Sequence, residues 1–251
     1  MCPVNNLDAL TQALPRIGDG ILITLELTVG GAALALVLAL TLGTTARAGN
    51  LAIRGPARVL IEFFRGTSLL VQIFWLFYVL PLLGYQLAPV FCGILALGLN
   101  YGAYGAEVVR GAVNSVPKAQ TEAAVALGFS PWQRLRRILF PQAWALMIPP
   151  LANLLVHLLK GTAVASYITL QDLTFEIENL RDSTGDTLFA FGIGLLIYFV
   201  IAYLLSLGMN LLEARAKHKL GRGPSLREVL RLAPDTSLDA VAGSARQKVA
   251  P

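Results

Sequence analysis

Hydrophobic and polar residues form long alternating blocks along this chain of 251 residues, with five apolar stretches separated by polar segments. Each apolar stretch is close to the roughly 20 residues that an α-helix needs to cross about 30 Å of hydrocarbon. The stretches cover residues 21–43, about 59–83, about 87–109, about 142–164 and 188–212. The pattern therefore predicts an all-α integral membrane protein with about five transmembrane helices.

Prolines and small residues give three of these stretches a more specific prediction. The second stretch runs to Leu83 before a short loop over 85–89. The third contains Gly98, Gly102 and Ala106 at intervals of four, which lets two helix backbones approach closely in lipid, most simply within one subunit. The fourth contains Pro149 and Pro150. Because two backbone donors are missing there, we expect a kinked or broken helix.

The charges between the apolar stretches predict how the chain crosses the membrane. Arginines and lysines cluster after the first, third and fifth stretches, whereas the segment 171–186 is acidic. Basic segments stay in the cytoplasm, so five spans with an outside N-terminus and a cytoplasmic C-terminus fit every loop. We expect an external segment over 1–19, a transmembrane domain over 20–219 and a largely disordered cytoplasmic tail over 220–251. The expected location is the cell (inner) membrane.

Composition excludes several other classes of protein. Hydrophobic residues make up 55% and charged residues only 14%, compared with roughly 25% charged in a soluble domain, so a soluble enzyme is excluded. The net charge of +5 comes from the polar segments, so we interpret it as a topology signal and expect membrane lipid, but no nucleic acid, as a partner. The two cysteines and the isolated His157 predict no metal site.

The polar segment 115–141 is predicted to fold as two short helices. Pro117 lies in the opening turn of the first, which continues to Leu127, and Gly128 supplies the left-handed residue after it. Ser130 and Gln133 form a capping box for the second helix, which we expect Pro141 to end. The first helix carries one apolar stripe, made of Ala119, Ala123, Ala126 and Leu127. From these residues alone, the segment is either a docking hairpin for a partner or a hairpin lying on the membrane surface.

Polar side chains inside the apolar stretches fall on shared helix faces. The stripes are Glu62, Arg65, Ser68 and Gln72; Asn100, Tyr104 and Glu107; and Asn153, His157 and Lys160. Such groups are costly in the membrane and face protein or water. We take Gln72, Asn100, Tyr104, Asn153 and His157 as candidates for lining a solute pathway, and Glu62, Arg65, Glu107, Arg110 and Lys160 as structural. Pairing across helices explains both groups equally well.

Four motifs resemble those of permease subunits of ATP-binding-cassette (ABC) importers. Glu122-Ala123-Ala124 followed by Gly128, Ile138 and Pro141 is similar to their EAA motif. The segment 64–72, FRGTSLLVQ, resembles the FRGTPLLVQ signature of the polar amino-acid branch, with Ser68 in place of proline. The segments 103–111 and 160–163 resemble AYxAExxRG and KDTSL, the latter with Gly161 in place of aspartate.

This resemblance implies the type I importer permease fold and a role in transport without enzymatic activity. It implies that ATPase subunits, a second permease subunit (identical or paralogous) and an external solute-binding protein are partners. The ATPase-coupling residues would be Ala119, Glu122, Ala123, Ala124, Leu127 and Gly128. The chain has no phosphate-binding loop, so we expect it to hold no cofactor and the partner to bind ATP.

The solute implied by the resemblance is small and polar or zwitterionic. It would be an amino acid or a derivative such as ectoine or hydroxyectoine, since FRGTSLLVQ and the aromatic run after it look like permeases of that type. The alternative function is a secondary transporter or channel without an ATPase. That alternative predicts carboxylates at the bilayer centre, but Glu26, Glu62 and Glu107 all lie near the ends of their stretches.

Overall fold

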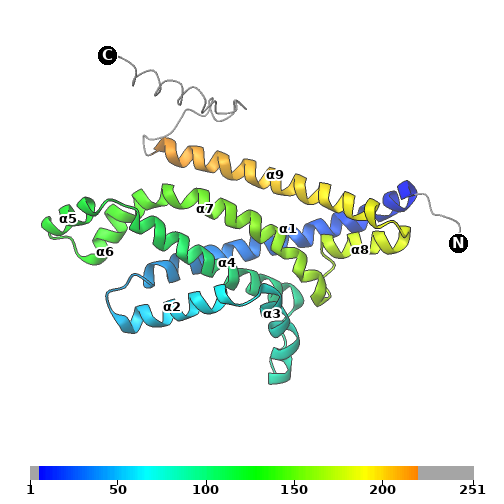
Figure 1. The fold of residues 1–251 in the computed structure, drawn as a ribbon, viewed down its shortest axis with the longest axis horizontal. Coiled ribbons are helices and arrows are strands. Elements are labelled where there is room, and N and C mark those ends of the chain that lie inside the picture. The colour runs from blue at the N-terminus through cyan, green and yellow to red at the C-terminus, as the bar shows by residue number, and fades with distance from the viewer. Residues whose placement is uncertain (1–5, 220–251) are drawn as a thin grey trace, which may run out of the picture. The chain divides into compact units, whose positions relative to one another are not determined.

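The computed structural model describes residues 6–219, and these residues are almost entirely helical (Figure 1). The prediction of an all-α protein is confirmed for this part of the chain. Its α-helices are α1 (Asn6–Thr45), α2 (Leu51–Gly66), α3 (Leu69–Phe74), α4 (Pro89–Asn114), α5 (Lys118–Ala126), α6 (Pro131–Arg134), α7 (Phe140–Gly161), α8 (Leu173–Thr184) and α9 (Thr187–Lys219). Two π-helical segments, η1 (Trp75–Val79) and η3 (Leu135–Leu139), and two 3₁₀ segments, η2 (Leu80–Leu83) and η4 (Thr162–Ile168), extend them.

The small-residue ridge of α4 packs against α1 of the same chain, as the spacing predicted. A Cβ atom added to Gly98 would lie 2.5 Å from Leu34 Cδ2, and one added to Gly102 would lie 2.8 Å from Leu38 Cβ. On the α1 side, a Cβ atom on Gly43 would lie 2.7 Å from the Ala106 carbonyl oxygen. The two helices therefore approach so closely that only glycine fits at these contacts.

The contacts between helices fix their relative directions. Residues pair in ascending order between α1 and α4, from Gly31 with Leu97 to Gly43 with Val109, so these helices are parallel. Helix α7 is antiparallel to α4, because the Tyr101 hydroxyl donates to the His157 carbonyl and Gly105 faces Leu151. These directions match the alternation that the predicted spans require. The side of the membrane on which each end lies remains a prediction.

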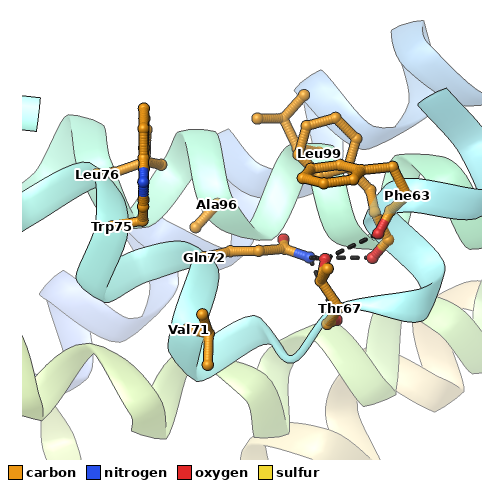
Figure 2. A pocket seen from close by; sticks show the side chains of 9 residues that line it. Phe63, Thr67, Val71, Gln72, Trp75, Leu76, Ala96 and Leu99 are labelled. Atoms are coloured by element: carbon orange, nitrogen blue, oxygen red, sulfur yellow. Dashed lines mark hydrogen bonds between the residues drawn. The ribbon is translucent and has the colours of Figure 1, made fainter. Parts of the chain in front are cut away.

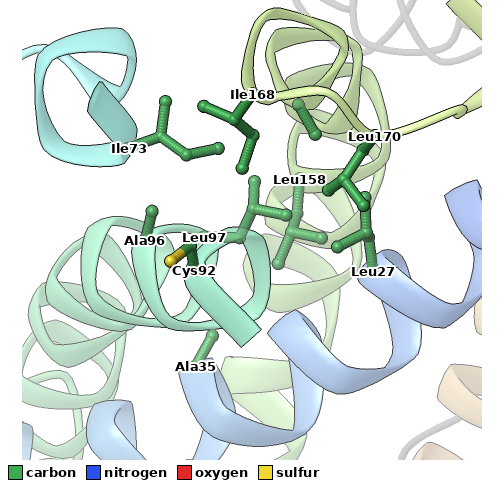
Figure 3. Packing of buried hydrophobic residues seen from close by; sticks show 10 residues of the cluster. Leu27, Ala35, Ile73, Cys92, Ala96, Leu97, Leu158, Ile168 and Leu170 are labelled. Carbon is green, nitrogen blue, oxygen red and sulfur yellow. The ribbon is translucent and has the colours of Figure 1, made fainter. Parts of the chain in front are cut away.

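A buried cluster joins the segments that carry the candidate site (Figure 3). It combines Leu27 from α1, Leu97 from α4 and Leu158 from α7, each at most 1% exposed. Ile73 from α3 and Ile168 from η4 complete it from the other side. Because lipid chains are as apolar as these side chains, burying them stabilises the fold through close van der Waals packing and not through removal from water.

The second predicted span is not one continuous helix, and this corrects the sequence prediction. Helix α2 and the run Leu69–Leu83 meet at an angle of 102°. Thr67 (φ −104°, ψ 148°) and Ser68 (φ −68°, ψ 135°) are extended between them. Three consecutive residues of low helix propensity, Gly66, Thr67 and Ser68, explain why the helix ends there. We call this bend the elbow.

The predictions for Pro141 and for the double proline also need correction. Pro141 does not end a helix, because α6, η3 and α7 follow one another without a break and Pro141 lies in the first turn of α7. A missing N–H costs little at that position. Helix α7 continues through Pro149 and Pro150 to Gly161, so the helix is not broken there, and the kink that was the other expectation stays a prediction. Packing against neighbouring helices allows prolines inside membrane helices.

Three of the described helical segments are long and apolar enough to cross a membrane individually. They are α1, the run Pro131–Ile168 and the part of α9 over Thr187–Arg215, and the bent pair at the elbow makes a fourth if it counts as one span. Helix α4 does not meet the same criterion, although residues along much of its length are buried. Because α4 is enclosed by protein, it needs fewer large apolar residues than a lipid-facing helix does. The number of five spans remains a prediction.

Candidate functional site

The predicted hairpin over 115–141 is present and its turns follow the sequence signals. Helix α5 ends near Leu127, and Gly128 has the positive φ of +74° that favours glycine. Ser130 caps α6 with both bonds of the capping box: its Oγ accepts from the Gln133 N–H at 3.3 Å, and its own N–H donates to Gln133 Oε1 at 2.9 Å. The hairpin is therefore held by local hydrogen bonds as well as by packing.

The coupling candidates on α5 divide into buried and exposed residues. Ala124 is 1% exposed, so it is the residue that packs into the hairpin. Ala119, Glu122, Ala123 and Gly128 are exposed, and Leu127 is 74% exposed. A Cβ atom at Gly128 would meet no heavy atom within 4 Å. Helix α5 thus presents a ridge of small side chains with an exposed leucine at its end, a shape that fits into a groove of another protein.

The elbow gathers three of the pathway candidates around the end of α2. A helix end leaves its last carbonyl groups without intrahelical donors. Asn100 Nδ2 donates to the Phe64 carbonyl oxygen at 3.0 Å, and Gln72 Nε2 donates to the same oxygen at 3.0 Å and to Thr67 Oγ1 at 2.7 Å. The Tyr104 hydroxyl donates to the Arg65 carbonyl oxygen at 3.3 Å. In this structure these side chains donate hydrogen bonds to the carbonyl groups at the end of α2. This is the pairing across helices that the sequence left open as an alternative.

The charged residues at the ends of α2 and α4 form ion pairs within their own helices. Arg65 Nη1 lies 3.3 Å from Glu62 Oε1, and Arg110 Nε donates to Glu107 Oε2 at 3.1 Å. The Arg65 guanidinium also lies 5.5 Å from the centre of the Tyr104 ring. Each pair is partly exposed, so its contribution to stability is small. The pairs cancel the charges of both glutamates.

The polar stripe of α7 remains open. Asn153, His157 and Lys160 are all exposed, and their side chains make no hydrogen bond or ion pair among the described residues. The sequence spacing placed them on one face, and the structure leaves that face uncovered. Since uncovered polar groups at this depth require water or a polar solute, α7 contributes the polar surface best suited to a pathway.

Asp172 lies outside the predicted spans and caps α8, a role that the sequence did not suggest. Its Oδ1 accepts from the Phe175 N–H at 3.1 Å, while its side chain is fully buried and Oδ2 has no partner among the described residues. Burial raises the pKa of this carboxyl from 3.8 to about 6. The Thr24 hydroxyl accepts from the Leu173 N–H at 3.1 Å, which ties the start of α8 to α1.

No group of three or more His, Cys, Asp or Glu side chains that could hold a metal ion occurs within residues 6–219. The described residues offer three features: a ridge of small side chains on α5 that is suited to docking, an exposed polar face on α7, and a helix break that the amides of Asn100 and Gln72 stabilise.

The family comparison identifies this arrangement. Residues 31–218 match the family described as the inner membrane component of binding-protein-dependent transport systems. The chain belongs to this family. It is therefore a permease subunit of an ABC importer and a multi-pass membrane protein. In such systems the ATPase is a separate subunit, and the family implies a solute-binding protein as a further partner. The alternative of a carrier or channel without an ATPase is thereby overturned.

Individual relatives support the same assignment. The permease is 44% identical over 207 residues to the probable amino-acid ABC transporter permease protein y4tF of Sinorhizobium fredii, covering 80% of this chain and 87% of that protein. It is 33% identical to the L-cystine transport system permease protein TcyB of Bacillus subtilis, covering 84% and 96%. It also resembles the glutamine transport system permease protein GlnP of Escherichia coli, at 32% identity, covering 83% and 96%.

Solved structures confirm the fold. An amino acid ABC transporter crystallised with histidines matches with a TM-score of 0.77 at 30% identity, covering 84% of the permease and 99% of that chain. The inward-facing MetNI methionine ABC transporter matches with a TM-score of 0.70 at 18% identity, covering 80% and 96%. The latter likeness shows the fold alone.

The structural roles of Tyr101, Gly161 and Thr67 were not predicted from the sequence, although Gly161 and Thr67 lie in the quoted motifs. Tyr101 holds the end of α7, since its hydroxyl donates to the His157 carbonyl oxygen at 2.8 Å. Gly161 makes room for that hydroxyl, because an added Cβ atom would lie 2.6 Å from it. Thr67 completes the elbow by accepting from Gln72. The Gly66-Thr67-Ser68 run was a usable signal for the helix break, but nothing in the sequence linked Tyr101 to Gly161.

Proposed function

We propose that the permease forms half of the pathway of an ATP-driven importer for an amino acid or a zwitterionic amino-acid derivative. The observation that carries the proposal is the exposed polar face of α7, with Asn153, His157 and Lys160, in a chain that also has a hairpin shaped for docking at the other end of this helix. Amide, imidazole and ammonium groups suit a solute that carries both charge and hydrogen-bonding groups. The amino-acid permeases named among the relatives support the same class of solute.

The proposed coupling residues are those of α5 and its turn. Ala119, Glu122, Ala123 and Leu127 contact the ATPase, Ala124 fixes the helix within the hairpin, and Gly128 sets the turn. Closure of the ATPase pair on ATP displaces α5 and moves the spans. The equilibrium between inward-open and outward-open states shifts only by the difference in ligand affinity between them.

The proposed pathway residues differ in their roles. Asn153 and His157 contact the solute directly, and Lys160 joins them because it shares their uncovered face. Gln72, Asn100 and Tyr104 act by holding the elbow, since their hydrogen bonds go to backbone carbonyl groups. Ectoine and hydroxyectoine belong in the same uptake screen as the amino acids, because each is a small zwitterion.

The remaining parts of the proposal concern partners and location. The complex contains a second permease subunit, identical or paralogous, two ATPase subunits that bind the ATP, and an external solute-binding protein. The permease itself holds no cofactor and no metal. The proposal places residues 1–19 outside the membrane, although they are largely helical from Asn6 onward. The proposed cytoplasmic tail over 220–251 lies outside the described residues.

The test is retention of the ATPase during purification in mild detergent. Gly128→Asp places a β-carbon at a left-handed position and disturbs the turn after α5, so the ATPase is lost. Gly49→Asp is the matched control, because Gly49 also has open space around it and does not have a positive φ. Retention in the control and loss in Gly128→Asp support the proposal. Equal retention in both variants contradicts it.

A further inference from the structure

A cavity of about 300 Å³ lies in the angle of the elbow (Figure 2). Phe63 and Phe64 of α2 form one wall, Val71 and Trp75 of the α3–η1 run form another, and Ala96 and Leu99 of α4 close the back. The volume is at the lower end of the range typical of ligand sites. The 102° bend between α2 and the next helical run produces this space.

The cavity offers almost no polar surface to a ligand. Its polar lining residues are Thr67 and Gln72. As Figure 2 shows, the Gln72 amide points to the elbow, where Nε2 donates to Thr67 Oγ1 and to the Phe64 carbonyl oxygen. Gln72 Oε1 is buried and has no hydrogen-bond partner among the described residues, so it is an unused acceptor beside the cavity. A zwitterionic solute would still leave most of its polar groups unpaired there, at a cost of several kcal/mol. The cavity is therefore unsuited to the imported solute.

The rim of the cavity is apolar and exposed. Phe63 is 57% exposed, Val71 59% and Trp75 48%. All three lie in the second apolar stretch of the sequence, within a membrane protein. This stretch is predicted to cross the membrane, and the described part of the chain leaves these three side chains uncovered, so lipid acyl chains are the most abundant apolar groups that can reach the cavity.

We propose that the elbow cavity binds an acyl chain of a membrane lipid. A flexible unbranched chain can follow the angle between α2 and α3, and it replaces the dispersion contacts that an empty space would lose. The bound chain fills the space between Trp75 and Phe63 and contacts both side chains. The inference concerns a site separate from the polar face of α7, so it does not depend on the identity of the solute.

The test uses Trp75 as a reporter at the cavity rim. Replacing Trp132 and Trp144 by phenylalanine leaves Trp75 as the sole tryptophan. The permease, assembled with its ATPase, is reconstituted in vesicles of phosphatidylcholine with or without bromine atoms at mid-chain, since bromine quenches tryptophan fluorescence on contact. Val71→Phe, from the exposed wall, and Ala96→Phe, from α4, each fill the cavity. The control reporter is Phe199→Trp on the exposed side of α9, with Trp75 also replaced by phenylalanine.

We expect brominated lipid to quench Trp75, and either filling variant to reduce that quenching at least twofold. Quenching of the Phe199→Trp reporter should not change. If Ala96→Phe fails to assemble, Val71→Phe carries the test because its side chain starts from an exposed position.

Absence of Trp75 quenching in the assembled complex would show that a second permease copy covers the cavity. Relief of quenching by saturating amino acid would assign the cavity to the solute. Unchanged quenching in Val71→Phe would show that Trp75 meets lipid only from outside. Each of these three results overturns the proposal.

Discussion

The shared acceptor at the elbow makes a prediction that a double-mutant cycle can test. The Phe64 carbonyl oxygen accepts from both Asn100 Nδ2 and Gln72 Nε2, each at 3.0 Å. A carbonyl oxygen has two lone pairs, so it remains satisfied when either donor is removed. Only the double variant leaves it without a side-chain donor. Asn100→Leu and Gln72→Met keep approximately the original side-chain volume, so they remove the donors without a large cavity.

The magnitudes follow from the number of bonds that each side chain makes. Asn100→Leu removes one hydrogen bond and is expected to cost about 1 kcal/mol of unfolding free energy. Gln72→Met also removes the bonds to Thr67 and is expected to cost about 2 kcal/mol. The double variant should exceed the sum by about 1 kcal/mol, because the partly buried Phe64 carbonyl group then loses both side-chain donors and bears part of its desolvation cost.

The assay is unfolding of the purified permease in mixed micelles as the fraction of SDS is raised. Solute-stimulated ATP hydrolysis, measured across a concentration series, is the second readout. Costs that add within about 0.3 kcal/mol would refute the shared-acceptor argument. A raised KM for solute in Asn100→Leu with unchanged stability would instead make the amide a solute ligand.

Three further perturbations have expected outcomes. Gly98→Ala should lower the free energy of unfolding by about 1–3 kcal/mol in the same assay, because Leu34 of α1 occupies the space that the new methyl group needs. Gly18→Ala, in α1 and with no heavy atom within 4 Å, is the control and should leave that free energy unchanged or raise it. Gly161→Ala should lower the melting temperature and Tyr101→Phe should restore part of it, since the hydroxyl is the nearest atom at 2.6 Å; no rescue would contradict this contact. The pKa of Asp172 is about 6 in the folded protein, against 3.8 for an unperturbed aspartate. The protonated carboxyl group therefore contributes about 3 kcal/mol to the free energy of unfolding below pH 4, and this contribution is lost as the pH rises through 6. The stability of Asp172→Asn relative to the natural protein should therefore increase from pH 5 to pH 8, and a flat difference would show that the carboxyl is not destabilised by burial.

Features encoded by neighbouring residues could be predicted from the sequence. Ser130 and Gln133 form the predicted capping box, and Gly128 has the predicted left-handed conformation, because each depends on residues within one turn. The ridge of Gly98 and Gly102 also packs against a helix of the same chain, as expected, since small residues at intervals of four let two helix backbones approach closely.

Features that depend on distant segments could not be predicted in the same way. Periodicity placed Asn100 and Gln72 on helix faces, but it could not show that both faces point to the end of α2. The apolar character of the second stretch concealed the break at Thr67, because hydropathy averaged over a window does not register three residues of low helix propensity. Conversely, Pro149 was given too much weight as a helix breaker, since tertiary packing holds α7 together.

The uninterrupted helical run from Pro131 to Ile168 gives the permease a mechanical lever. At 1.5 Å per residue, the 22 residues of α7 extend about 33 Å, close to the thickness of the hydrocarbon core of a bilayer. A tilt of about 10° around the midpoint of α7 would displace both of its ends by about 3 Å in opposite directions. The wide π-helical turn at Leu135–Leu139 lies between hairpin and rod, where it can absorb bending. If a docked partner pushes the hairpin, as proposed, this continuous helical run would carry the displacement toward Ile168, which is packed in the buried cluster with Leu27 and Leu158.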